Sequence, residues 1–355
     1  MTRRYAVLAL DRFATDAKTA HGVIAYGEDE VVAIVDPSQA GKRVREVLPY
    51  LDSDAPIVAS VREALAFSPT ALLIGTAPPG GALPAQWRRA VLDALDARLD
   101  VVSGLHDMLG EDPDFAAIAR EHHREIWDVR KPPEVPLFSG AVYDAAAPTL
   151  LLVGNDCAVG KMTAALELVR AAREAGVNAR FVPTGQTGIM IAGWGISVDR
   201  VVADFAPGAA EQLVLYAARE GAELVVVEGQ GCINHPAYAP VTLALMYGAA
   251  PDALVLVCEP RKRRIEHFAT PVLSYRELIR LHEALLATVK PAEVAGIALN
   301  TRGLSDDEAR AEIARARAET ALPADDVVRF GPHRLYASIA ASLRRRPPLA
   351  APAGA

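Results

Sequence analysis

Short apolar runs alternate with amphipathic segments along most of the 355-residue chain. Continuous apolar runs are typical of strands buried on both faces of a parallel sheet, and the segments between them repeat apolar residues at helical spacing. Strands that alternate with helices form mainly parallel sheets through crossover connections. The pattern therefore predicts an α/β protein.

The first part of the chain, residues 1–130, is predicted to form a Rossmann-like domain. The residues after Leu10 read DRFATDAKTAHG and lack the GxGxxG pattern of dinucleotide-binding folds, so NAD is not predicted. The segment 75–81, GTAPPGG, is equally compatible with a ligand loop and with a turn made by glycine and proline. The predicted strands are 5–10, 31–35, 71–74 and 101–102, and the predicted helices are 61–66, 86–97 and 113–127.

A second domain is predicted over residues 149–343. Repeated prolines indicate an extended linker at 131–148, and the tail 344–355, RRRPPLAAPAGA, is predicted to be disordered and solvated. The predicted strands of this domain are 150–153, 178–182, 223–227, 253–258, 294–299 and 326–330, and its predicted helices are 163–175, 209–220, 274–287, 305–318 and 334–345.

The second domain begins with TLLLVGNDCAVGKMTAALEL (149–168), which predicts a strand, a loop and a helix. In that geometry the loop N–H groups and the helix N-terminus converge on one point that favours a phosphate. The alternative is a plain turn between strand and helix, with glycines for tight packing. The predicted phosphate-binding residues are Gly154, Asn155, Asp156, Cys157, Ala158, Val159, Gly160, Lys161, Met162 and Thr163.

Two details distinguish this loop from the common P-loop, which has four residues between its glycines and a Mg²⁺-binding Ser or Thr directly after its lysine. Here five residues separate Gly154 from Gly160, Met162 follows Lys161, and the first hydroxyl is that of Thr163. A thioether is a poor ligand for Mg²⁺. The loop is therefore predicted to hold phosphate better than it holds Mg²⁺.

A polar segment, EGQGCINHP, follows the predicted strand 223–227. Glu228 takes the position at which P-loop proteins place a carboxylate that acts on the metal or its water. Either Glu228 or His235 could take a proton from an attacking amine, although a histidine before proline is more often structural. Cys232 could also act as a nucleophile activated by His235. The alternative interpretation is that Cys232 is a small, buried and unreactive thiol.

Two further segments supply candidate ligand-binding residues. The segment 183–205, PTGQTGIMIAGWGISVDRVVADF, is predicted to be a long functional loop, or else an apolar loop packed at an interface. It would place Thr184, Gln186 and Thr187 beside the phosphate loop, with Asp204 as a further carboxylate. The basic run 261–264 could bind a phosphate or carboxylate or be a solvated loop, and residues 300–302 could likewise read a base or a carboxylate.

Composition narrows the class of partner. A net charge of −7 argues against a generic binder of nucleic acid or anionic membranes, so a small molecule is expected. The three cysteines, Cys157, Cys232 and Cys258, lack CxxC spacing, and no disulfide framework or metal site is predicted. No apolar run reaches the length of a membrane span or a signal segment, so a cytoplasmic location is predicted.

Three motifs carry a resemblance that covers nearly the whole chain. GNDCAVGKMT, PTGQTGIMIAGWGISVDRVVADF and EGQGCINHPAY, after a Rossmann-like domain, resemble the two-domain P-loop family that includes bacterial D-glutamate N-acetyltransferase. More distantly, GNDCAVGK and EGQG resemble dethiobiotin synthetase and its amide-ligase relatives, from whose pattern Met162 departs.

The first resemblance implies acetyl transfer from acetyl-CoA to the amine of D-glutamate, which gives N-acetyl-D-glutamate and CoA. The base is then expected to be Glu228 or His235, with Asp204 as a reserve candidate. The alternatives are an ATP- and Mg²⁺-dependent ligase or carboxylase and a non-catalytic nucleotide-sensing module. A homo-oligomer is expected, since P-loop relatives often self-associate. The residues expected to bind substrate are Thr184, Gln186, Thr187, Gln230, Arg263 and Arg302.

Overall fold

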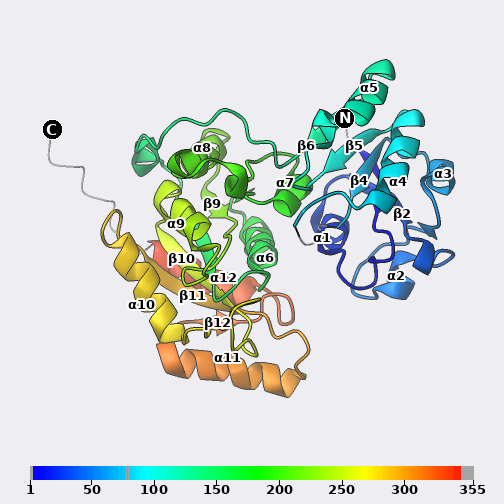
Figure 1. Ribbon diagram of the computed structural model, residues 1–355. Helices are drawn as coiled ribbons and strands as arrows, with labels where there is room; N and C mark the ends of the chain where they lie inside the picture. The colour runs from blue at the N-terminus through cyan, green and yellow to red at the C-terminus, as the bar shows by residue number, and fades with distance from the viewer. Residues whose placement is uncertain (1–2, 77, 79, 345–355) are drawn as a thin grey trace. The chain divides into compact units, whose positions relative to one another are not determined.

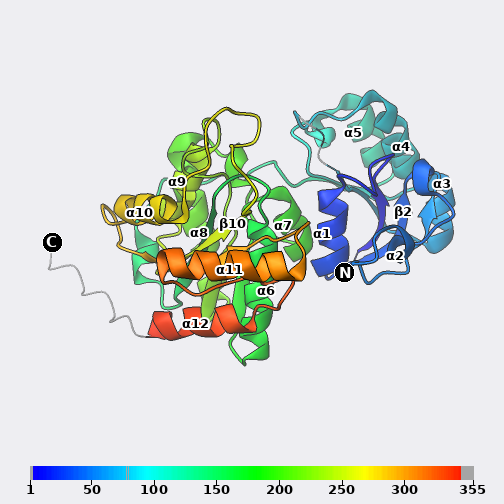
Figure 2. The ribbon, with the colours of Figure 1, turned by 90° about the horizontal axis from the view of Figure 1, so that it is seen from below.

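The computed structural model describes residues 3–76, 78 and 80–344 and divides into two compact units, each built on a six-stranded sheet (Figures 1 and 2). The first unit comprises the chain up to residue 134 together with residues 185–200, and the second comprises 135–184 and the chain from 201 onward. All pairs of neighbouring strands in both sheets are parallel. The predicted α/β class is confirmed.

The first unit has the strand order β3-β2-β1-β4-β5-β6. The order reverses between β1 and β4, and ligands of such open sheets bind beyond the carboxyl ends of strands at a reversal of this kind. Its strands are β1 (Arg4–Leu8), β2 (Glu30–Val35), β3 (Ile57–Val58), β4 (Ala71–Ile74), β5 (Asp100–Ser103) and β6 (Ile126–Asp128). Its helices are α1 (Lys18–Tyr26), α2 (Val44–Val47), α3 (Val61–Ala64), α4 (Ala85–Asp96), α5 (Pro113–Glu121) and α7 (Gln186–Ala192).

The loop after β1 is held by a carboxylate rather than by a glycine-rich turn. Asp36, fully buried after β2, accepts hydrogen bonds from the backbone N–H groups of Asp11 (3.1 Å) and Phe13 (3.0 Å). It also accepts one from the N–H of Ser38 at 2.9 Å. In dinucleotide-binding folds an acidic residue at about this place contacts the ribose. Here the carboxylate fixes the local backbone instead.

The second unit has the strand order β12-β11-β10-β7-β9-β8. Strand β7 lies between β10 and β9, and every residue of β7, β9 and β10 is buried, which explains their continuous apolar runs. Its strands are β7 (Thr149–Gly154), β8 (Ala179–Val182), β9 (Leu224–Val227), β10 (Ala253–Cys258), β11 (Glu293–Leu299) and β12 (Ala324–Asp325). Its helices are α6 (Lys161–Glu174), α8 (Ala206–Arg219), α9 (Ala239–Gly248), α10 (Tyr275–Leu286), α11 (Asp306–Thr320) and α12 (His333–Arg344).

Several predicted elements were wrong or missing. The strand predicted at 326–330 is a turn, because the Asp326 carboxylate accepts the N–H groups of Val328 and Arg329 at 3.0 and 2.9 Å. The helix predicted at 113–127 ends at Glu121, and β6 follows. Sequence reasoning also missed α1, α2, α9, β3 and β12. The predicted long loop at 183–205 contains α7, and its residues 185–200 belong to the first unit.

The predicted linker is fixed against α8 over residues 136–144. Glu211 of α8, which is buried, accepts the N–H of Ser139 (2.7 Å) and the N–H of Val142 (3.2 Å). Val142 lies in a short 3-10 helix, Ala141–Asp144. The proline-rich segment is therefore packed rather than an extended spacer.

Some predictions concern residues that the structure does not describe. Apart from Arg344, the last residue of α12, the predicted tail 344–355 lies outside the described residues, as do positions 77 and 79 of the possible ligand loop. Among the described residues, no helix combines the length and the apolar character needed to cross a bilayer.

Gly208 of α8 gives a test of the linker packing. A Cβ atom at this position would lie 2.0 Å from the carbonyl oxygen of Pro136. Gly208→Ala is therefore expected to lower the free energy of unfolding by about 1–3 kcal/mol through overpacking, as measured by urea denaturation. Gln212→Ala on the same helix is the control and should change little. Equal stability of wild type and Gly208→Ala would contradict this packing.

Candidate functional site

The predicted phosphate loop connects β7 to α6 at the carboxyl edge of the second sheet. Ala158 and Gly160 have positive φ angles of 54° and 101°, which turn the chain sharply before the helix begins at Lys161. Within the described part of the chain, the N–H groups of Lys161, Met162 and Thr163 have no acceptor. Three free donors at the start of a 14-residue helix are an arrangement that favours an anion.

Lys161 connects this loop to the segment that follows β9. Its side chain is only 6% exposed, and its Nζ donates to the carbonyl oxygens of Asp156 (2.7 Å) and Gly231 (2.8 Å). Burial lowers the pKa of Lys161, and the nearby anionic groups, Asp156 and Glu228 among them, oppose that shift. Since an ammonium group has three N–H donors, one donor remains for a bound anion.

Asp156 fixes the outer side of the loop through charge. It is fully buried, its Oδ2 lies 2.9 Å from the Nζ of Lys262, and the same oxygen accepts the N–H of Glu266 at 2.8 Å. Burial alone would raise the pKa of Asp156, but hydrogen bonds from Lys262 and from the N–H groups of Glu266 and Cys157 lower it. Lys262, in the basic run 261–264, therefore pairs with the loop itself.

Two asparagines hold the loop backbone. Asn155 exchanges hydrogen bonds with the N–H (3.2 Å) and the carbonyl (3.3 Å) of Glu259, directly after β10. Asn300, directly after β11, donates to the carbonyl oxygen of Val159 at 3.2 Å. Asn300 was predicted to read a base or a carboxylate, and this contact gives it a structural partner.

Glu228, Thr184 and Gln230 form a compact network between the ends of β9 and β8. The Glu228 carboxylate accepts the N–H of Thr184 at 3.0 Å, and the Thr184 hydroxyl donates to the Glu228 carbonyl at 2.9 Å. Gln230 donates to the carbonyl of Thr184 at 2.5 Å. Gly229 permits this arrangement, since a Cβ there would lie 1.6 Å from the carbonyl of Leu152. The network places one carboxylate, 7% exposed, beside the lysine.

His235 lies close to the phosphate loop, with its Nε2 atom 3.9 Å from Oδ1 of Asp156. Its Nδ1 accepts hydrogen bonds from the N–H groups of Ala237 (3.1 Å) and Tyr238 (3.2 Å). Ligand atoms of Asp156, Cys157 and His235 lie within 4.8 Å of one another, a spacing that a metal ion could bridge. The ammonium groups of Lys262 and Lys161 beside Asp156 oppose binding of a cation there.

The three cysteines gather near the same lysine but are poor nucleophiles. Burial raises the pKa of Cys232 to about 11, and burial also raises the pKa values of Cys157 and Cys258. The Cys232 thiol lies 3.0 Å from Oδ1 of Asn234. Because the thiolate is the reactive form, this environment argues against a nucleophile made of Cys232 and His235.

The remaining predicted site residues lie in different places. Gln186 and Thr187 belong to the first unit, where Gln186 accepts from Nε of Arg130 at 3.3 Å and Thr187 lies 3.0 Å from the hydroxyl of Thr19. Of the three polar residues predicted beside the phosphate loop, the second unit contains Thr184. Asp204 is exposed in the 3-10 helix Ala203–Phe205, and Arg263 and Arg302 are exposed after β10 and β11.

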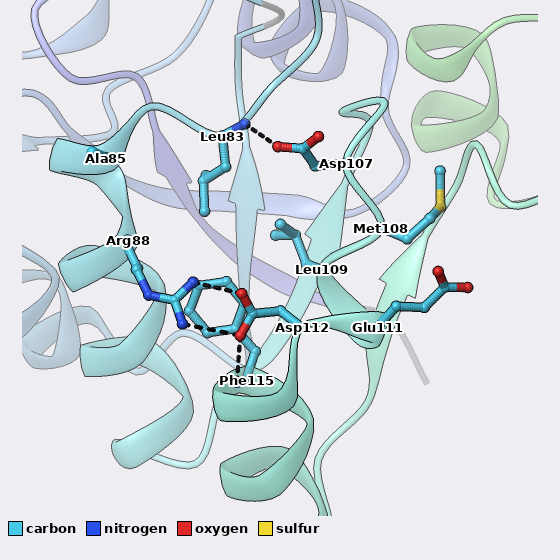
Figure 3. Close-up of a pocket in the computed structure, with 9 residues that line it drawn as sticks. All are labelled: Leu83, Ala85, Arg88, Asp107, Met108, Leu109, Glu111, Asp112 and Phe115. Carbon is cyan, nitrogen blue, oxygen red and sulfur yellow. Dashed lines mark hydrogen bonds and ion pairs between the residues drawn. The ribbon is translucent and has the colours of Figure 1, made fainter.

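A cavity of about 380 Å³ in the first unit contains none of the predicted site residues. At its wall Arg88 forms two hydrogen bonds, of 2.6 and 3.0 Å, with Asp112 at the start of α5 (Figure 3). Arg88 also contacts Asp114, so its charge is neutralised within the protein. The residues that line the cavity are Leu83, Ala85, Arg88, Asp107, Met108, Leu109, Glu111, Asp112 and Phe115.

Comparison with known proteins identifies the domain types. Residues 136–336 match the DUF1611 domain of unknown function, described as a P-loop domain, and residues 37–132 match its N-terminal counterpart, described as Rossmann-like. The predicted pairing of these two domains is confirmed. A crystal structure of a DUF1611 family protein from Anabaena variabilis is 37% identical, covers 96% of this chain and 100% of its own, and has a TM-score of 0.91.

Two D-glutamate N-acetyltransferases are also similar in sequence to this chain. A D-glutamate N-acetyltransferase from Tritonibacter scottomollicae is 36% identical over 286 residues, which cover 79% of this chain and 84% of the relative. A D-glutamate N-acetyltransferase from a Pseudoalteromonas species is 34% identical over 284 residues, with the same coverage of 79% and 84%.

The pairing of Asp156 with Lys262 predicts a pH dependence of stability. Because the pKa of Asp156 is lowered on folding, its stabilisation is fully present above the unfolded-state value of about 3.9 and is lost as pH falls through the lower folded-state value. Asp156→Asn should cost about 2 kcal/mol of unfolding free energy at neutral pH. We expect this difference to shrink below about pH 4 in urea denaturation series.

The matched control is Asp16→Asn, which removes a carboxylate from the exposed Arg12–Asp16 pair. It should change stability little at any pH. An Asp156→Asn deficit that stays constant down to pH values well below the unfolded-state pKa would contradict a charge-based role for Asp156.

Proposed function

The chain belongs to the DUF1611 family, which joins a Rossmann-like N-terminal domain to a P-loop domain, and from this we propose that it is an N-acetyltransferase. In this proposal it moves an acetyl group from acetyl-CoA to the amine of D-glutamate or a related amino acid. The products are the N-acetyl amino acid and CoA. The named relatives support this reaction at about one-third identity.

The observation that carries the proposal is a phosphate loop built for binding rather than for phosphoryl transfer. The free N–H groups at the start of α6 and the buried Lys161 suit the diphosphate of coenzyme A. Met162 stands where a Mg²⁺-binding hydroxyl would be needed to break a phosphoanhydride. A carrier whose diphosphate is held but not cleaved does not require that hydroxyl.

The reaction needs a base, because the amino-acid substrate carries an ammonium group at neutral pH. The base removes one proton, the nitrogen attacks the thioester carbonyl, and N–H donors stabilise the oxyanion. The carbon–sulfur bond then breaks, and CoA leaves as a thiolate that takes up a proton. A new carbon–nitrogen bond remains in the product.

Among the three predicted bases, the local geometry favours Glu228. Its carboxylate lies at the end of β9 in the network that faces Lys161, whereas Asp204 is exposed in a 3-10 helix. The Nδ1 of His235 already accepts two backbone N–H groups.

The first test is an assay of free-thiol release from acetyl-CoA with D-glutamate, in the presence of EDTA. We expect turnover without added Mg²⁺. Lys161→Met keeps the apolar stem but removes the ammonium group, so the Kd for CoA should rise about tenfold or more in calorimetry. Lys131→Met, which alters an exposed lysine paired with Glu111, is the control and should bind CoA normally.

Two outcomes would overturn the proposal. Formation of ADP from ATP and Mg²⁺ with a carboxylate or amine substrate, without thiol release, would indicate a ligase or carboxylase. CoA or nucleotide binding that depends on Lys161, with no turnover across a panel of D- and L-amino acids, would indicate a sensing module.

The second test separates the candidate bases. Glu228→Gln keeps the size of the side chain and removes its basicity, so kcat should fall about 100-fold or more while the Kd for CoA changes little. Asp204→Asn makes the same chemical change at the exposed position and should retain kcat. The reverse pattern, with Asp204→Asn inactive and Glu228→Gln active, would transfer the role of base to Asp204.

A further inference from the structure

The ring of His235 is held in one orientation by its surroundings. The side chain is only 2% exposed, and it packs against the rings of Tyr238 and Phe268 at centroid distances of 4.6 and 5.2 Å. The backbone N–H groups of Ala237 and Tyr238 both point at Nδ1, at 3.1 and 3.2 Å. The other ring nitrogen, Nε2, faces the phosphate loop 3.9 Å from Asp156.

These two hydrogen bonds determine the position of the proton on the ring. An N–H group only donates, so the Nδ1 atom that receives two of them must present its lone pair and cannot carry a proton. In neutral imidazole the proton is then on Nε2. Protonation to imidazolium would put a hydrogen on Nδ1 against both backbone donors, so the neutral form is strongly favoured.

Four charged groups on neighbouring segments act on this ring. Asp156 in the phosphate loop and Glu266 in the loop after β10 favour the protonated ring, and Lys161 of α6 and Lys262 disfavour it. Burial is the largest effect, and the pKa of His235 is lowered overall. The charges therefore do not reverse what the hydrogen bonds dictate.

We propose that His235 is a neutral hydrogen-bond donor whose Nε2–H contacts the anion held by the phosphate loop, and that it is neither the base of the reaction nor a metal ligand. This role of His235 rests on one part of the proposed function, namely that the phosphate loop binds a diphosphate. A neutral imidazole that donates from a buried site can polarise an anionic oxygen without titrating at neutral pH.

The same tautomer decides two other questions about the site. A base at Nε2 would need a lone pair there, and that atom carries the proton. A metal ion at the cluster of Asp156, Cys157 and His235 would need the same lone pair. With Nε2 protonated, the cluster has two potential ligand atoms, and Asp156 is already paired with Lys262.

The chain has an internal reference with the opposite tautomer. Nδ1 of the fully buried His282 lies 2.7 Å from the carbonyl oxygen of Leu278, and a carbonyl only accepts, so Nδ1 carries the proton. Its Nε2 has no hydrogen-bond partner among the residues that the structure describes. The two rings should therefore give opposite patterns in one spectrum.

The decisive experiment is ¹⁵N NMR of the imidazole rings in the full-length protein between pH 6 and 8. We expect His235 to be protonated on Nε2 and His282 on Nδ1, each neutral throughout. Added inorganic pyrophosphate should shift the Nε2 resonance of His235 and leave that of His282 unchanged. A His235 ring that is protonated on Nδ1, or is imidazolium at pH 6, would overturn the proposal.

Two variants test the role of the donor. The amide of His235→Gln can donate near the Nε2 position but cannot act as a base, whereas His235→Leu can do neither. We expect His235→Leu to weaken pyrophosphate binding about tenfold and His235→Gln to keep most of both binding and acetyl transfer. An equal loss of kcat in His235→Leu and His235→Gln, with pyrophosphate binding intact, would indicate that His235 is the base.

These measurements separate the two proposals. Wild-type protein that binds pyrophosphate through Lys161 but shows no change at His235 would overturn the donor role and leave the proposed function standing. Pyrophosphate binding with the expected shift, but no acetyl transfer to any amino acid, would support the donor role and overturn the acetyltransferase. Absence of pyrophosphate binding in wild type would overturn both.

Discussion

The buried ammonium group of Lys161 is the interaction on which the rest of the site depends. By donating to the carbonyls of Asp156 and Gly231, it ties the phosphate loop to the segment after β9. Asp156 in turn pairs with Lys262 in the segment after β10, and Asn155 forms a hydrogen bond with Glu259 in that same segment. These polar contacts hold together the segments that follow β7, β9 and β10. The same contacts position the free N–H groups at the start of α6.

The sequence predicted this loop well because local features specify it. An apolar run, two glycines and a lysine are enough to indicate a strand, a tight turn and a helix start, whatever the rest of the chain does. The roles of Asn155 and Asp156 could not be read in the same way. Their partners Glu259 and Glu266 are 104 and 110 residues away, and only the parallel sheet brings them together.

The errors have a similar physical origin. The length and the glycines of segment 183–205 predict a loop, yet Gln186–Ala192 forms α7, which ends at Gly193 with a φ of 73°. Thr184 lies in the second unit, whereas Gln186 accepts a hydrogen bond from Arg130 and Thr187 lies beside Thr19 in the first. Hydrophobic periodicity specifies an element's type, and it does not specify which of two sheets the element joins.

The first unit is made of two pieces of the chain, and this has a consequence for how the protein can be divided. The polypeptide passes from one unit to the other at 134–135, 184–185 and 200–201. A fragment that starts at residue 135 would carry α7 away from α1, and a fragment that stops there would lose it. A single break at the 134–135 junction therefore gives no fragment that consists of the complete first unit alone.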